Sequence, residues 1–424
     1  MHKRVLAGVI SISLLQAIAF PAMASSDLSH WITWAVEHDV AKQQIQSQAD
    51  AMTDAGVASS QWMDPKLKLG VGGLPIDSFA LDKDPMTNLS VGLMQQFGRG
   101  DTLTLKQQQT REQADSIRKK LGVRALDVRF AMTNLWIEAV YQRNARQLLQ
   151  QNKALFKELE QYLSMNYGVG VNQAQDVIQA QLQIARVDDK LDANAQVQQR
   201  IKAQLSEWLG EQAQSVVPKH YPKWSTLQAY LDTQTSSPNY YSALAQHPSV
   251  AVVDALIKSN ETSIDIANEA YQPQFGVEVM YGNRQATGMN GQPASDLLSV
   301  YLTMDMPLFT ENRQDKQVSS AQHQLGATKA QRDLLLQQMN AQVEAVRHDR
   351  MNLQQRLDRY QNGLLRYAKE KTQAIERGYQ NNTSQLDEYI RAASDALSVE
   401  LEQARLQADL ALANAKLSYL LNKF

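Results

Sequence analysis

The sequence predicts an α+β fold built from two internal repeats, each with two amphipathic strands and a very long helical hairpin. Three observations predict it. Short segments recur at a nearly constant distance, long stretches lack proline, and further segments alternate between apolar and polar residues. Alternation with a period of two is typical of strands, and apolar residues spaced three and four apart are typical of coiled-coil helices.

Composition excludes several classes of protein. The chain has 424 residues, no cysteine and a formal net charge of −2. Without cysteine there is no disulfide framework, thiolate metal site or cysteine nucleophile. A balanced charge argues against nucleic acid as a partner, because phosphate binding needs an excess of basic side chains.

The first residues have the pattern of a signal peptide over 1–24. Lys3 and Arg4 give a basic start, an apolar stretch follows, and Ala22-Met23-Ala24 precedes the expected cleavage site. Beyond residue 25 there is no apolar run of about 18 residues, so the sequence predicts no transmembrane helix.

Two halves of the remaining chain resemble each other. We expect a first repeat over residues 25–210, a second over 239–424, and a proline-containing linker over 211–238. The recurring segments are Asp64-Pro65-Lys66-Leu67 with Gln272-Pro273-Gln274-Phe275, Leu89-Ser90-Val91 with Leu298-Ser299-Val300, and Gly170-Val171-Asn172 with Asn381-Asn382-Thr383, at offsets of 208, 209 and 211 residues.

Long helices follow from the proline-free stretches between Pro85 and Pro218 and after Pro307. A helix over about 101–166 would be roughly 100 Å long at about 1.5 Å per residue, so it must lie against other helices. The second stretch predicts a coiled-coil seam, in which Arg350 interrupts one step, formed by Leu336, Met339, Val343, Val346, Leu353, Leu357, Tyr360, Leu364 and Tyr367.

The helical hairpins are expected to turn at related positions in the two repeats. In the first, Gly168 and Gly170 can take positive φ, and Asn172 with Gln175 suggests a capping box. In the second, Asn381 stands where positive φ is expected, and Thr383 or Ser384 is expected to cap the next helix.

Alternation predicts strands over about 66–74, 88–97, 274–282 and 297–307. Each has one apolar and one polar face, a pattern shown both by membrane barrels and by half-buried sheets of soluble proteins. In a membrane a sheet cannot keep a free edge, and four strands are too few to close. Three chains would close a twelve-stranded barrel, continued by the hairpins as a hollow α-barrel, which makes the predicted fold an α+β membrane protein.

The arrangement resembles the TolC-type outer-membrane factors of the outer membrane efflux protein family. The resemblance rests on the duplicated architecture, Asp64-Pro65 and Gln272-Pro273 before the first strand of each pair, Met306-Pro307-Leu308-Phe309 after the last strand, and the two hairpin turns. It implies a homotrimer in the outer membrane with a long periplasmic extension. It also implies a passive exit duct of a tripartite efflux system that works with a periplasmic adaptor and an inner-membrane pump, without enzymatic activity, cofactor or bound metal.

The resemblance also assigns site residues. Asp387 falls on the acidic position of the pore aperture, although an Asp in the first turn of a helix is equally explained by the helix dipole. Ile390 stands where relatives carry a second acid, and Thr383 where some carry a base. The turns that would dock an adaptor contain Gly168, Gly170, Asn172, Asn381 and Thr383, and the expected lumen charges are Glu278, Asp305, Lys66 and Lys68.

Three segments of the first repeat resemble the heavy-metal subgroup that serves pumps of the resistance-nodulation-division (RND) type: Leu74-Pro75, Pro85-Met86-Thr87 and Arg99-Gly100-Asp101. Drug efflux and type I protein secretion remain alternatives, as does a periplasmic coiled-coil adaptor or scaffold with a soluble sheet. An enzyme is the weakest interpretation, because the sequence contains no nucleophile elbow, HExxH motif or phosphate loop.

Overall fold

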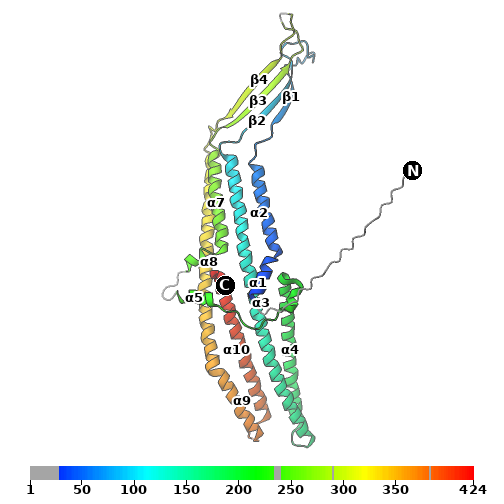
Figure 1. Ribbon diagram of the computed structural model, residues 1–424, viewed down its shortest axis with the longest axis vertical. Helices are drawn as coiled ribbons and strands as arrows, with labels where there is room; N and C mark the ends of the chain where they lie inside the picture. The colour runs from blue at the N-terminus through cyan, green and yellow to red at the C-terminus, as the bar shows by residue number, and fades with distance from the viewer. Residues whose placement is uncertain (1–27, 234–239, 289–290, 382) are drawn as a thin grey trace, which may run out of the picture.

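The computed structural model describes residues 28–233, 240–288, 291–381 and 383–424. The expected signal peptide and the last residues of the expected linker therefore lie outside the described residues. The molecule is elongated, with a sheet at one end and helices that run from it to two hairpin turns at the other end (Figure 1).

Both repeats have the same order of elements: a helix, two strands and a long helical hairpin. The first contains α1(Leu28–Glu37), α2(Val40–Ser59), β1(Lys66–Gly72), β2(Asn88–Gln96), α3(Thr102–Gly168) and α4(Ala174–Leu209). The second contains α6(Tyr241–Leu244), α7(Pro248–Glu269), β3(Gln274–Asn283), β4(Leu297–Asp305), α8(Gln314–Arg359), η2(Tyr360–Leu364), α9(Leu365–Gln380) and α10(Leu386–Leu421). Between them lie η1(Gly210–Ser215) and α5(Ser225–Asp232).

The four strands form one antiparallel sheet in the order β1-β2-β3-β4. The central pair joins the two repeats, with Val91 opposite Tyr281 and Leu93 opposite Val279. Strands β1 and β4 are the edges, and neither edge is paired within the described chain.

Helix α3 is the spine of the molecule. It has 67 residues and is therefore roughly 100 Å long, and it packs against α2, α4, α7 and α10. Below the middle of the molecule the two hairpins share a core, in which Leu159 and Leu163 of α3 meet Ile390 and Leu397 of α10. The hairpins are held together by ordinary apolar burial between side chains far apart in the sequence.

The seam expected to run through Tyr367 is interrupted. The end of α8 passes into one π turn, η2, before α9 begins. Above this turn Leu336, Met339 and Val343 are buried, whereas Leu364 at the end of the turn and Tyr367 below it are exposed. A π turn inserts one residue into the helical repeat, so the apolar stripe rotates away from the partner helix. The expectation that Leu364 and Tyr367 belong to the seam was wrong.

Two further cores surround the middle of the molecule. One joins α1, α3 and α4 through Trp31, Trp136 and Leu205, and the other joins α5, α7, α8 and α10 through Leu227, Val250 and Leu417.

Among the helices of the described ranges, none combines the length and the apolar character that a membrane span requires.

Candidate functional site

One face of the sheet is a continuous apolar surface. Its side chains alternate with polar ones along each strand and remain exposed in the single chain. They are Leu67, Leu69, Val71, Leu89, Val91, Leu93, Phe275, Val279, Tyr281, Leu298, Val300, Leu302 and Met304. An exposed apolar patch of this extent is normally covered by lipid or by protein.

The opposite face carries expected lumen charges, and two of them form an ion pair. The Lys68 ammonium lies 2.5 Å from a carboxylate oxygen of Glu278, whose residue is only 8% exposed. Lys66 lies two residues before Lys68 on the same exposed strand. The pair connects β1 to β3 across β2, and its two opposite charges largely cancel each other because they are in contact.

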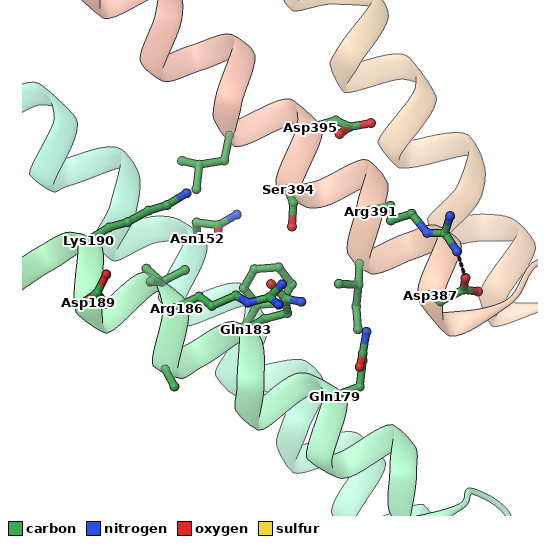
Figure 2. Close-up of a pocket in the computed structure, with 15 residues that line it drawn as sticks. Asn152, Gln179, Gln183, Arg186, Asp189, Lys190, Asp387, Arg391, Ser394 and Asp395 are labelled. Carbon is green, nitrogen blue, oxygen red and sulfur yellow. Dashed lines mark hydrogen bonds and ion pairs between the residues drawn. The ribbon is translucent and has the colours of Figure 1, made fainter.

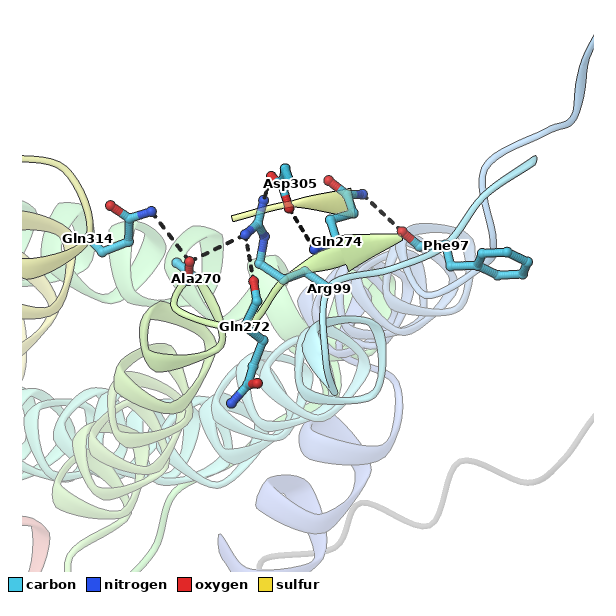
Figure 3. Close-up of polar contacts among 7 residues, drawn as sticks. All are labelled: Phe97, Arg99, Ala270, Gln272, Gln274, Asp305 and Gln314. Atoms are coloured by element: carbon cyan, nitrogen blue, oxygen red, sulfur yellow. Dashed lines mark hydrogen bonds and ion pairs between the residues drawn. The ribbon is translucent and has the colours of Figure 1, made fainter. Parts of the chain in front are cut away.

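Asp305, the fourth expected lumen charge, lies where the sheet meets the helices. It accepts a hydrogen bond from the Gln274 N–H (2.6 Å) and forms an ion pair with Arg99. The Arg99 guanidinium also donates to the carbonyls of Gln272 (2.6 Å) and Ala270 (3.4 Å), as Figure 3 shows. One arginine after β2 thus fixes the start of β3, the end of β4 and the end of α7.

Gly100 completes this junction. It has a φ of +45°, and a Cβ there would lie 1.8 Å from a carboxylate oxygen of Glu269. The same carboxylate accepts the N–H of Asp101 at 2.9 Å, at the start of α3. Arg99-Gly100-Asp101 is therefore a structural joint between strand and helix.

The outer hairpin turns between α3 and α4. Gly170 has a φ of +79°, as expected, whereas Gly168 still belongs to α3 and does not have positive φ. The expected capping box of Asn172 and Gln175 was wrong. Gln173 is the N-cap and Asp176 closes the box, because the cap falls one residue later than expected. Asn172 donates to Asp176 at 3.2 Å.

The inner hairpin turns between α9 and α10, and it also differs from expectation. Asn381 has a φ of −96°, so it does not adopt the left-handed conformation. The N-cap is Gln385, boxed by Glu388, while Thr383 hydrogen-bonds back to the carbonyl of Gly378 through its N–H (2.7 Å) and its hydroxyl (3.0 Å). Those two hydrogen bonds close the turn, so Thr383 does not cap α10 and Gln385 is its N-cap.

The two turns are connected through a tyrosine. Burial raises the pKa of Tyr379 on α9, and a hydrogen bond with Asn172 of the outer turn acts in the opposite direction. This contact joins the inner hairpin to the outer one close to the tip.

Asp387 lies in the first turn of α10 and forms an ion pair with Arg391, four residues on. Both border a groove of about 800 Å³ between α10 and α4. Figure 2 shows Arg186, Gln179 and Gln183 of α4 on the other side of this groove, and Asp395 of α10 above. The Asp387 side chain is 41% exposed and the Arg391 side chain 75% exposed. The carboxylate is therefore available to solvent and already has a basic neighbour.

A half-buried polar network couples the two hairpins further up. Arg405 of α10 lies 2.8 Å from Glu138 of α3 and 2.6 Å from Asp409, with its guanidinium over the ring of Tyr141. The two carboxylates hold the pKa of Arg405 well above its usual range, although burial opposes them. Burial raises the pKa of the neighbouring Tyr221 to about 12. A guanidinium with two carboxylates is charge-assisted and geometrically specific.

Sequence analysis did not identify Arg391 or Arg405, and it named Arg99 only as part of a segment that resembles a subgroup, without a structural role. Arg391 and Asp409 each lie four residues from their partner on α10, a spacing that signals helical ion pairs. Arg99 has no such local signal, because its partners are about 170 to 206 residues away. In the described ranges there is no group of three or more His, Cys, Asp or Glu residues suited to holding a metal ion.

The model of the outer membrane efflux protein family matches residues 239–423, which form the second repeat. A comparison with curated proteins finds no relative.

Among solved structures, the fold is similar to the outer membrane protein VceC of Vibrio cholerae, with 16% identity, a TM-score of 0.73, and 93% of this chain and 96% of that one covered. It is also similar to a membrane protein from Pseudomonas aeruginosa, with 13% identity, a TM-score of 0.75, and 93% of this chain and 90% of that one covered. A third similar structure is the CmeC outer membrane channel of Campylobacter jejuni, with 10% identity, a TM-score of 0.71, and 93% of this chain and 85% of that one covered. The second repeat thus carries the sequence pattern of outer membrane efflux proteins, on a chain that has the fold of outer-membrane channels.

Proposed function

We propose that this chain is one third of a trimeric exit duct in the outer membrane, serving a tripartite efflux system. Each subunit contributes four strands to a twelve-stranded barrel, and its hairpins extend the conduit into the periplasm. The duct itself is passive, and a pump in the inner membrane drives transport through an adaptor.

The observation that carries this proposal is the sheet. Its apolar face is exposed along the whole length of all four strands, and strands β1 and β4 end it with unpaired edges. In hydrocarbon each unpaired backbone group costs several kcal/mol, so such a sheet must be closed by further strands. Pairing β4 of one copy with β1 of the next removes every edge after a few copies. Three copies give a lumen wide enough to conduct.

The polar face of the sheet supports a conduit of weak charge selectivity. Lys68 and Glu278 neutralise each other, and Ser90, Gly92 and Ser299 line the same face. Selective pores instead concentrate one sign of charge or a ring of carbonyl groups.

At the far end, the tip would form the gate. Three copies of Asp387 around a narrow aperture would repel one another and attract cations, while Arg391 on the same helix offsets part of that charge. The turns containing Gly168, Gly170 and Asn172, and Asn381 and Thr383, are the ends of the hairpins and are proposed as the adaptor's docking points.

For the pump we propose an RND-type partner, and for the cargo heavy-metal cations. The support is the resemblance of three segments in the first repeat. Two of those segments have structural roles here: the Thr87 hydroxyl donates to the Gly73 carbonyl at 2.8 Å, and Arg99-Gly100-Asp101 forms the junction described above. Drug efflux and type I secretion stay as alternatives. To separate them, the growth of a strain that lacks the protein would be compared with that of the complemented strain on copper or silver salts, on dyes and on bile salts.

An alternative of a different class is a periplasmic scaffold. The deciding experiment is fractionation of cells that express the full chain. A duct sediments with outer membranes, resists washing with salt and urea, and elutes as a trimer in mild detergent. It also conducts ions in planar bilayers. A monomer that is released by a salt wash would exclude the duct and favour the scaffold.

A further inference from the structure

A second cavity near the tip, of about 350 Å³, lies between the outer and the inner hairpin. It is separate from the groove at Asp387, and none of its lining residues borders that groove. Its walls come from one face each of α3 and α9, at helical spacings of three and four, and from the first turn of α10. The lining residues are Leu155, Glu158, Leu159, Tyr162, Glu376, Tyr379, Gln380 and Tyr389.

Three tyrosine rings dominate these walls. The rings of Tyr379 and Tyr389 are nearly parallel, with an interplanar angle of 7° and centroids 6.2 Å apart. Tyr389 is almost fully buried, and Tyr162 of α3 is half exposed. Aromatic faces carry negative electrostatic potential and attract cations, most strongly where water is excluded.

Two carboxylates accompany the rings. The side-chain carboxylates of Glu158 and Glu376 form no hydrogen bond or ion pair with any residue that the structure describes. Burial raises the pKa of Tyr389, and the carboxylates of Glu376 and then Glu158 raise it further. Glu376 is half-buried and Glu158 is exposed, and the charges of both act on Tyr389 in the cavity wall.

The nearby basic residues do not cancel these charges. Arg391 pairs with Asp387 at the other groove, and Lys153 pairs with Asp188; none of these four residues lines this cavity. Lys157 and Arg377 are the sequence neighbours of the two glutamates, but both are exposed and neither lines the cavity.

We propose that this cavity is a binding site for a small organic monocation, of the alkylammonium class. The tyrosine rings would surround the alkyl groups of the ammonium, and Glu158 and Glu376 would supply the counter-charge. The volume is at the lower end of the range for small-molecule sites, which suits a ligand the size of choline or tetraethylammonium. This proposal concerns binding alone and does not depend on the duct function.

A consequence follows from the position of the walls. Since α3 belongs to the outer hairpin and α9 to the inner one, a bound cation contacts both. A ligand that binds one arrangement of two elements stabilises that arrangement. Occupancy should therefore hold the hairpins together as they are in this structure.

Calorimetric titration of the detergent-solubilised full chain with choline tests the proposal. Its neutral isostere, 3,3-dimethyl-1-butanol, separates recognition of charge from simple apolar filling. We expect saturable binding of choline, and binding of the isostere weaker by about tenfold, because the rings and carboxylates recognise the charge.

Variants locate the site. Glu376→Gln and Tyr379→Leu should each weaken choline binding by about five- to tenfold, whereas Tyr379→Phe, which keeps the ring, should retain it. Glu370→Gln is the matched control, since it makes the same change of charge on an exposed position of α9 outside the cavity, and it should bind like the parent chain.

The outcomes are distinct. No saturable choline binding by the folded parent chain would overturn the proposal. Equal binding of choline and its isostere, or equal weakening by Glu370→Gln and Glu376→Gln, would overturn it as well. A circular-dichroism spectrum and a thermal midpoint equal to those of the parent chain establish that each variant is folded before its titration is interpreted.

Discussion

Asp387 combines two properties that its sequence position alone left open. It lies in the first turn of α10, where the helix dipole favours a carboxylate, and it faces a solvent-filled groove with Arg391 as its partner. The ion pair is exposed and contributes little to the stability of the fold. Its removal is therefore expected to alter the aperture without unfolding the tip.

We predict that Asp387→Asn raises ion conductance and lowers cation preference in planar bilayers, since three negative charges leave the aperture and Arg391 becomes unpaired. Asp395→Asn is the control, because Asp395 lies on the same helix about two turns from Asp387, where it pairs with Lys371. If conductance and ion preference of Asp387→Asn equal those of the parent, Asp387 has no role in the gate.

The buried environment of His247 makes the stability of the fold depend on pH. It caps α7 by accepting the Ser249 N–H at 3.2 Å and is 1% exposed. Burial lowers the pKa of His247, although a backbone contact with Tyr419 and the charge of Asp127 oppose the shift. The folded chain thus favours the neutral ring.

The lowered pKa of His247 makes the folded chain less stable at acidic pH. Below about pH 6.5 the unfolded chain takes up a proton at His247 before the folded chain does, so the free energy of unfolding falls as pH decreases through that range. We predict a smaller loss of thermal midpoint between pH 7.5 and 5.5 for His247→Asn, which keeps a capping acceptor. His38→Asn, at an exposed ring, should keep the full loss, and an equal loss in all three proteins would contradict the prediction.

At the scale of elements, the inner hairpin has a weak point at η2. The π turn interrupts the seam, α9 below it has no buried residue within its bounds, and Gly363 lies inside the turn. Few buried contacts and an irregular turn are typical of segments that open locally. Helix α9 is therefore the segment of the inner hairpin most able to move relative to the outer hairpin.

Gly363→Ala tests this weak point. A Cβ there would meet only the ring of Tyr367, at 3.5 Å, so alanine fits and stabilises the helical turn by about 0.5–1 kcal/mol. Hydrogen exchange of the amides of α9 should slow by about two- to fivefold. Gly326→Ala, in open space on α8, makes the same substitution away from the turn and should leave exchange in α9 unchanged. Equal exchange of α9 in all three proteins would show that η2 does not limit its opening.

The whole molecule is organised around a sheet whose two edge strands are unpaired in the described chain. Its apolar face and unpaired edges are the features from which we propose assembly of copies, and the Arg99 junction connects the strands to α3 and α7. The Arg405 network then connects both hairpins below the junction. Polar contacts thus connect the sheet to the helices and the two hairpins to each other.

Neighbouring positions on β2 test the orientation of this sheet. Val91→Arg places a charge on the apolar face near the middle of the strand, at a cost of about 2–4 kcal/mol in a bilayer, and should reduce the urea-resistant outer-membrane fraction and the trimer. Ser90→Arg places the same side chain on the opposite face and should keep both while changing ion preference. Comparable membrane fractions for the two variants would show that the apolar face is not in contact with lipid.

The sequence determined the duplicated plan, the approximate ranges of strands and helices, and the two faces of each strand. These features depend on local periodicity, proline spacing and glycine, which can be read from neighbouring residues. Tertiary structure decided the remainder: the cap at Gln173 instead of Asn172, the π turn that ends the seam, and the partners of Arg99, Arg405 and Glu278. Such features depend on side chains that are distant in the sequence and meet only after folding, so no local pattern encodes them.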